Sequence, residues 1–335
     1  MNRVLAGRRV RAILRSWKKN HACAGRLSVK TFLIVGIESV VGANLAASWC
    51  GQTRVVGVSA GSNINLPGCE RGTFERGNAD GIHNCLQQTR ATHVIFCGSA
   101  ARSFWEPASK GFENSEAVFW ATATAQEKRH FTLISSDAVF TGPWMFHAEE
   151  STATCPSAEA TEIRQVENRV REASEQSLIV RTNAFGWSTS GSKGWIETLL
   201  SGIENNQPLE LDPISHATPI LASDLADYLD PALDDELTGV FHIAGAERVS
   251  PHQFVRQLAS AFEVGSPATR TIRELAARPT GFGRGETSLQ TRRFRNEYEC
   301  AMPLLNEGLA RLLEQDRSGY RDRLCGQTTR QDKAA

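Results

Sequence analysis

Residues 31–42, with the sequence TFLIVGIESVVG, join an apolar segment to a turn that contains glycine. Thr31–Val35 is apolar and rich in β-branched residues, which predicts a strand buried inside a parallel sheet. Gly36 follows directly, and apolar residues with helical spacing begin near Val41. A glycine after a strand permits a tight turn, and amide groups at the start of a helix attract phosphate. The stretch therefore predicts a dinucleotide-binding loop.

The glycines of this loop are spaced as Gly-x-x-Ser-x-x-Gly from Gly36 to Gly42. A small middle residue lets a pyrophosphate approach the backbone, and the last glycine permits close packing of helix against strand. Ser39 is small enough for the middle position, and its hydroxyl is a further candidate donor. Two glycines six residues apart are weak evidence alone. The alternative is a tight turn that binds nothing.

Strand-like and helical segments alternate from residue 31 to about residue 188. The alternation predicts βαβ units and an α/β fold of the Rossmann type, with a doubly wound parallel sheet. After Trp187 the alternation stops, and Gly239–Ala244 is the one late strand that we expect. The other expected strands are 54–58, 93–97, 131–135 and 178–181, and the expected helices are 41–50, 82–88, 116–128 and 162–174.

The pattern divides the chain into four parts. Residues 1–29 form a basic tail, for which we favour an unstructured segment over a transit peptide or a membrane-surface helix. Residues 30–188 form the NAD(P)-binding Rossmann domain. Residues 189–320 form a smaller C-terminal substrate-binding part, from which residues 239–245 return to the sheet. Residues 321–335 are expected to be a polar tail.

The composition excludes several classes of partner. Lysine plus arginine and aspartate plus glutamate both number 37, so a neutral net charge gives no support for nucleic acid. No apolar run reaches the roughly 18 residues of a membrane span. The eight cysteines include no Cys-x-x-Cys pair, so no zinc site is expected. A reducing, cytoplasmic compartment is the expectation.

The form of the cofactor depends on the end of the second strand. An NAD site places an acid there to hold the ribose hydroxyls, but residues 58–62 read VSAGS. Ser59 tolerates a 2′-phosphate, although no arginine follows at once. The sequence therefore favours NADP over NAD only weakly.

Residues 134–142, ISSDAVFTG, resemble the strand end of the dTDP-4-dehydrorhamnose reductase family. These extended short-chain dehydrogenases reduce a 4-keto nucleotide sugar. Further similar segments follow in the family's order, so the resemblance covers roughly residues 30–315. They are 178–182, 217–226, 239–254, 278–279, 288–289 and 304–313.

The resemblance implies a Rossmann domain and a smaller domain that closes over a sugar nucleotide. Ser136 would bond the keto oxygen of the substrate. Gly36, Ser39, Val40 and Val41 would lie along the pyrophosphate, and Gly98, Ser99 and Ala100 would line the cofactor.

The sequence departs from this family at the proton donor. The family uses a tyrosine, with a lysine four residues on that lowers the phenol pKa and holds the ribose. Counting from Pro156 places Ala160 at the tyrosine and Arg164 at the lysine. A shift of the alignment does not restore the pair, because the first tyrosine of the chain is Tyr228. Arg164 remains a candidate donor to ribose or phosphate.

Other acids in this part of the chain are Glu159, Glu162 and His147, which we interpret as solvent-facing residues. Ser136 itself is more simply a strand-end or capping residue than a catalyst. Trp144 lies in the loop over the expected site and is the tryptophan least easily explained as packing alone.

Three functions remain open. The first is a diverged oxidoreductase of nucleotide-sugar metabolism, catalytically impaired and using NADP or NAD. The second is a non-catalytic module that binds NAD(P) or a nucleotide sugar and regulates a partner. The third is an epimerase-like or dehydratase-like enzyme on the same scaffold. A nucleotide sugar is the expected small-molecule partner, and a homodimer or a regulatory protein is the open question among protein partners.

Overall fold

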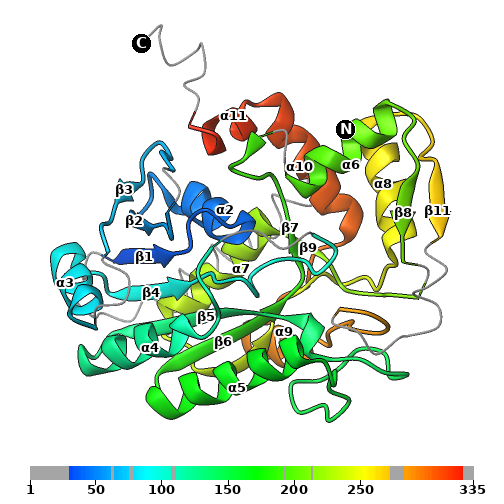
Figure 1. Ribbon diagram of the computed structural model, residues 1–335. Helices are drawn as coiled ribbons and strands as arrows, with labels where there is room; N and C mark the ends of the chain where they lie inside the picture. The colour runs from blue at the N-terminus through cyan, green and yellow to red at the C-terminus, as the bar shows by residue number, and fades with distance from the viewer. Residues whose placement is uncertain are drawn as a thin grey trace, which may run out of the picture.

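A parallel sheet of seven strands lies at the centre of the molecule, in the order β10-β6-β5-β4-β1-β2-β3 (Figure 1). The computed structural model describes residues 30–61, 64–74, 79–106, 111–191, 194–212, 214–271 and 283–326. The Rossmann-type α/β fold that we predicted is confirmed. The strands are β1 (Thr31–Val35), β2 (Arg54–Val58), β3 (Glu70–Arg71), β4 (His93–Phe96), β5 (His130–Ser136), β6 (Ser177–Thr182) and β10 (Gly239–His242).

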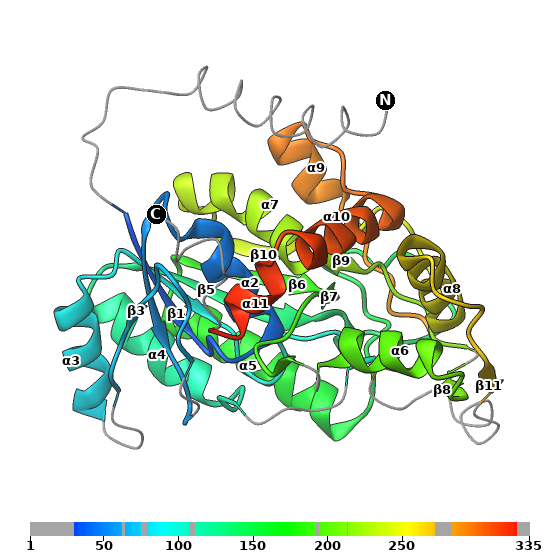
Figure 2. The same cartoon turned by 90° about the horizontal axis from the view of Figure 1, so that it is seen from above.

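Helices cover both faces of this sheet, which is why the central strands are mainly apolar on both faces. Figure 2 shows one group of helices on either side. In β1, Phe32 packs into the core under α2 and α7, whereas the next residue, Leu33, packs into the core under α3, α4 and α5. Alternate side chains of a strand thus fill opposite layers. The helices are α2 (Val40–Trp49), α3 (Ala79–Thr89), α4 (Glu116–Gln126), α5 (Ala158–Ala173) and α7 (Ala222–Asp234).

The remaining elements gather largely at the carboxyl edge of the sheet, on the right in Figure 1. The late strand β10 pairs in parallel with β6 and so extends the sheet. Two small two-stranded sheets join β8 to β11 and β7 to β9. These elements are β7 (Ala184–Phe185), β8 (Leu209–Leu211), β9 (Ile220–Leu221), β11 (Thr269–Thr271), α6 (Trp195–Glu204), α8 (Pro251–Phe262), α9 (Arg292–Tyr298) and α10 (Leu305–Arg317), with a short 3-10 helix, η1 (Asp137–Val139), after β5. Among the described residues, none of the helices has the length and apolarity of a membrane span.

A buried ion pair ties α5 to the sheet. The Arg181 guanidinium on β6 donates to both carboxylate oxygens of Glu167, with its Nη2 2.7 Å from Oε2. Ser135 on β5 donates to the same carboxylate at 2.6 Å. The Glu167 side chain is only 3% exposed, so its charge depends on these donors rather than on water.

The C-terminal segment corrects one prediction. We expected a polar tail from residue 321, but α11 (Tyr320–Leu324) packs on α2 and buries Leu324. The Tyr320 hydroxyl donates to Asn44 Oδ1 at 3.1 Å. Tyr320 and Leu324 stand four residues apart and therefore share one helix face. The predicted tails at residues 1–29 and 327–335 lie outside the described residues.

Replacing Tyr320 with phenylalanine tests this contact. Asn44 is fully buried and would lose the donor to its side-chain oxygen. An unsatisfied buried acceptor costs about 1–3 kcal/mol, so the free energy of unfolding should fall by that amount. Urea denaturation measures the change. An unchanged midpoint would show that α11 does not dock on α2 in solution.

Candidate active site

The turn after β1 requires both of its glycines. Gly36 has φ of +89°, and a Cβ there would lie 2.0 Å from the Cys97 carbonyl oxygen. A Cβ on Gly42 would lie 2.3 Å from the Gly36 carbonyl oxygen. The glycine spacing therefore serves the close packing of β1, β4 and α2.

Ser39 plays a different part from the one we expected. It is the N-cap of α2, where its hydroxyl donates to the Gly36 carbonyl at 2.8 Å and accepts from the Gly42 amide at 2.9 Å. Its single hydroxyl proton is thus used within the loop, and the prediction of a spare donor is wrong. The amide groups of Val40 and Val41 open the helix, and the first amides of a helix have no intrahelical partner. These two backbone groups are the candidates for phosphate.

The Glu38 carboxylate, which the sequence pattern did not indicate, lies at the end of β2. Glu38, from the loop after β1, accepts a hydrogen bond from the Ala60 amide at 3.1 Å through Oε1. Its Oε2 is buried and has no hydrogen-bond partner among the described residues. A ribose-binding acid is expected at the end of β2, where Ser59 stands. The carboxylate comes instead from the neighbouring turn, which lies outside the sequence of β2.

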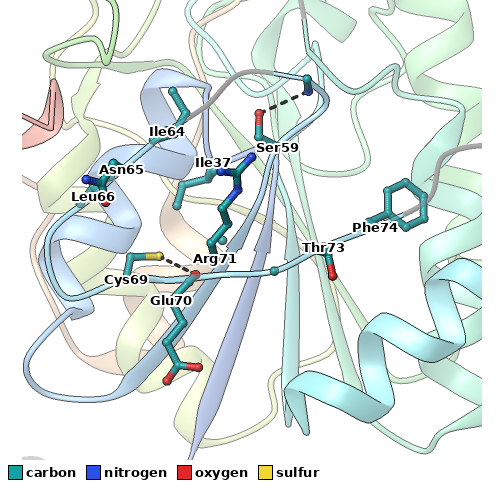
Figure 3. A pocket seen from close by; sticks show the side chains of 13 residues that line it. Ile37, Ser59, Ile64, Asn65, Leu66, Cys69, Glu70, Arg71, Thr73 and Phe74 are labelled. Atoms are coloured by element: carbon teal, nitrogen blue, oxygen red, sulfur yellow. Dashed lines mark hydrogen bonds between the residues drawn. The ribbon is translucent and has the colours of Figure 1, made fainter.

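A cavity of about 440 Å³ opens between this turn and the ends of β2 and β3. Ile37 forms part of its wall and packs against Gly57, where a Cβ would lie 2.1 Å from Ile37 Cδ1. Figure 3 shows Arg71 extending from β3 toward the side of Ile37 and Ser59. The shape and the side chains suit a nucleoside next to the phosphate-binding turn. The other lining residues are Gly61, Ile64, Asn65, Leu66, Cys69, Glu70, Gly72, Thr73 and Phe74.

The turn after β4 carries three predicted cofactor contacts. Gly98 is buried, and a Cβ there would meet the Phe96 ring at 2.6 Å. The Ser99 amide donates to the Phe112 carbonyl, and the Ala100 amide donates to Asn114 Oδ1 at 2.8 Å. These bonds fix the turn at the carboxyl edge of β4, next to β1.

Ser136 and Asp137 end β5 inside the protein. Ser136 is 1% exposed, and its hydroxyl accepts from the Ala138 amide at 3.1 Å, which is a capping role. Asp137 is fully buried and accepts from Asn183 Nδ2 at 2.9 Å and from Thr287 Oγ1 at 2.8 Å. Burial raises the pKa of Asp137 to about 7, against the effect of these donors. In this conformation neither side chain is open to a substrate.

The positions of the missing pair are structural. Ala160 is fully buried in the first turn of α5, and its amide donates to the N-cap hydroxyl of Ser157 at 3.2 Å. Arg164 donates to the Cys155 carbonyl at 2.7 Å and to Thr161 Oγ1 at 3.2 Å. Its guanidinium thereby holds the loop that leads into α5. The expected role of Arg164 at a ribose or phosphate stays a prediction.

The fold brings no tyrosine to this edge from elsewhere in the described chain. Tyr228 donates to the Ala301 carbonyl at 2.7 Å, and Tyr298 packs on Phe294 in α9. Tyr320 bonds to α2, as described above.

The three alternative proton donors differ in their exposure to solvent. Glu159 and Glu162 are exposed, as predicted. The prediction for His147 is wrong, because its ring is 2% exposed and stacks on Phe140 at 4.7 Å between centroids. The two ring nitrogens of His147 lie 3.0 Å from Ser151 Oγ and from the Glu286 carbonyl. Burial lowers its pKa, so His147 is a neutral packing residue at pH 7.

The loop before His147 projects outward. The Trp144 side chain is 69% exposed, and Met145 next to it is 61% exposed. Trp144 is therefore not a packing residue in this conformation.

The comparisons with known proteins agree with this architecture. The family model described as RmlD substrate binding domain matches residues 30–318. No curated protein matches the sequence significantly. Solved structures with the same fold include a dTDP-4-dehydrorhamnose reductase from Bacillus anthracis in complex with NADP. It is 15% identical with a TM-score of 0.67, and the match covers 86% of this chain and 100% of that one.

Two further similar structures act on nucleotide sugars by their names. One is a dTDP-glucose 4,6-dehydratase from Bacillus anthracis in complex with NAD, with 12% identity, a TM-score of 0.70, and coverage of 87% of this chain and 98% of that one. The other is a UDP-glucose 4-epimerase from Thermotoga maritima with UDP-glucose, with 12% identity, a TM-score of 0.68, and coverage of 87% and 99%. At these identities the likeness shows the fold.

Proposed function

The chain belongs to the family of the RmlD substrate binding domain, and from that membership we propose an NAD(P)-binding, oxidoreductase-like protein of nucleotide-sugar metabolism whose catalysis is impaired. The observation that carries the proposal is the glycine turn after β1, which opens directly onto the cavity at the ends of β2 and β3. A pyrophosphate on the amides of Val40 and Val41 would leave the adenosine in that cavity. The reductase from Bacillus anthracis named above holds NADP in the same fold.

The cavity favours NADP over NAD. Arg71 supplies the positive charge that the sequence lacked after β2, and Ser59 lines the same wall. A guanidinium binds a 2′-phosphate through charge-assisted hydrogen bonds. Glu38 opposes this preference, since its carboxylate suits ribose hydroxyls. We assign the larger effect to Arg71, because a charged guanidinium and a 2′-phosphate form stronger hydrogen bonds than a carboxylate and ribose hydroxyls.

Arg71→Met should therefore weaken NADP binding about tenfold or more, while NAD binding changes about twofold or less. Calorimetric titration of both cofactors measures the two affinities. Arg90→Met, an exposed arginine in the turn before β4, is the matched control and should change neither. Equal losses for NADP and NAD would remove Arg71 from phosphate recognition.

We infer impaired catalysis because the residues at the expected catalytic position are buried. Ala160 stands where the family has its proton donor, and Asp137, the acid beside Ser136, is fully buried and bonded to Asn183 and Thr287. The same observation favours a second candidate, a module that binds NAD(P) or a nucleotide sugar without turnover. An epimerase-like or dehydratase-like reaction is the third candidate, since proteins with those names share the fold. A cytoplasmic location, and a homodimer or a regulatory partner, belong to the same proposal.

The identity of the nucleotide that co-purifies with the chain is the direct test. The protein is denatured and the released small molecules are identified by mass spectrometry. NADP or NAD among them, with a dissociation constant below about 1 mM in titration, supports the proposal. No binding of either cofactor at millimolar concentration would show that the turn is a purely structural feature.

A further inference from the structure

Two cysteines meet at the wall of the adenosine cavity. Cys50 is the C-cap of α2, and Cys69 directly precedes β3. A Cβ on Gly68, beside Cys69, would lie 3.3 Å from Cys50 Cβ and 3.9 Å from Cys50 Sγ. The loop of Cys69 therefore rests on Cys50, and the Cys69 thiol donates to the Glu70 carbonyl at 3.5 Å. Both residues are partly exposed, so a soluble oxidant can reach them.

The other described cysteines lack this combination of pairing and access. Cys85, Cys97 and Cys155 are buried. Cys325 is partly exposed, but its thiol donates to the Ser188 carbonyl at 3.8 Å. Cys300 is also partly exposed, but it lies after α9 in a separate part of the fold. It provides a matched control for chemistry at an isolated thiol.

The two thiols are chemically unequal. The neighbouring Cys69 lowers the pKa of Cys50, whereas the neighbouring Cys50 and burial raise the pKa of Cys69. A thiolate is the nucleophile in thiol–disulfide exchange. Cys50 is thus the attacking residue, and Cys69 is placed to resolve the product.

We propose that Cys50 and Cys69 are a modification site that closes to a reversible intrachain disulfide. With glutathione disulfide as the oxidant, the Cys50 thiolate attacks one sulfur and expels one glutathione thiolate. Cys69 then loses its proton and attacks the Cys50 sulfur of the mixed disulfide, which expels the second glutathione. Two protein thiols are oxidised to one disulfide, and one glutathione disulfide is reduced to two glutathione molecules.

The disulfide acts on the cavity because Cys69 lines it. Cys69 Sγ lies 3.2 Å from the position of a Cβ on Gly57, which is the place where Ile37 also packs. A bond to Cys50 fastens the cavity wall 64–71 to the end of α2, the helix whose other end faces the phosphate. An ordered wall costs less entropy on binding, so the oxidised chain should bind adenosine nucleotides more tightly. This second step rests on the proposed cofactor site, whereas the disulfide does not.

The test uses the full chain, incubated with glutathione disulfide or with dithiothreitol and then alkylated. Non-reducing peptide mapping by mass spectrometry should find a peptide that links Cys50 to Cys69, and dithiothreitol should remove it. Cys50→Ser and Cys69→Ser should each abolish the linked peptide, and Cys300→Ser should retain it. Absence of the linked peptide in the wild type, or its persistence in Cys50→Ser, overturns the modification site.

NADPH titration of the two forms tests the coupling. The oxidised chain should bind NADPH about threefold or more tightly than the reduced chain, and Cys69→Ser should show no dependence on the oxidant. Equal affinities in a chain that carries the disulfide overturn the coupling. If neither form binds NADPH, the proposed cofactor function fails together with the coupling, while the linked peptide still supports the disulfide.

Discussion

Reduction of a nucleotide 4-keto sugar by this chain should be slower, by a factor on the order of 100 to 10,000, than reduction by a relative that carries the tyrosine. Hydride transfer to a carbonyl leaves an alkoxide, which must be protonated or strongly hydrogen-bonded as it forms. The hydroxyl of Ser136 is an N-cap and lies 3.5 Å from the Asp137 carboxyl, and both side chains are buried away from a substrate. Turnover of NADPH with a 4-keto nucleotide sugar, followed at 340 nm as is usual for NADPH, measures the rate.

The double variant Ala160→Tyr with Arg164→Lys restores the acid and should raise the rate by at least about tenfold. Ala160 is fully buried, and Arg164 holds the Cys155 carbonyl, so the variant also strains the start of α5. Ala160→Tyr alone keeps the Arg164 bonds and separates strain from chemistry. Thermal melting establishes that each variant is folded. Fast wild-type turnover that survives replacement of Glu159 and Glu162 would contradict the impairment.

The second large effect is on stability. Glu167→Ala should lower the free energy of unfolding by about 3–5 kcal/mol, because it leaves the Arg181 guanidinium buried without its carboxylate. Ser135 loses its acceptor in the same change. Guanidinium denaturation measures the difference. Glu162→Ala, at an exposed position of the same helix, is the control and should stay within about 0.5 kcal/mol. A similar loss in both variants would show that the helix, and not the ion pair, is responsible.

The sheet could be predicted from the sequence because its signal is local. Each strand of the sheet core is a short apolar run, and the alternation with helices carries the parallel topology. The strand β3 was missed, since Glu70–Arg71 is two polar residues without an apolar strand signal, although it pairs with β2 and Glu70 bonds to Arg54.

The site was less predictable, because its side chains are placed by distant partners. The burial of His147 depends on Glu286, which is 139 residues further along the chain. Arg71 reaches the cavity from β3, and Glu38 reaches β2 from another strand's turn. The small size of Ser39 suggested a ligand contact, but its hydroxyl closes the loop itself. The sequence therefore predicted where in the fold the site lies. It did not predict which partner each side chain bonds to, because those partners are distant in the chain.

The bonds of Asp137 also bear on the order in which the protein assembles. Its two donors lie 46 and 150 residues along the chain, at Asn183 and Thr287. During synthesis the strands β1 to β6 emerge and can pair well before Thr287 leaves the ribosome. Until then the Asp137 carboxylate lacks its last donor and favours contact with water over the closed interior. The edge of the sheet where chemistry would occur is therefore completed only after the chain has been made as far as Thr287.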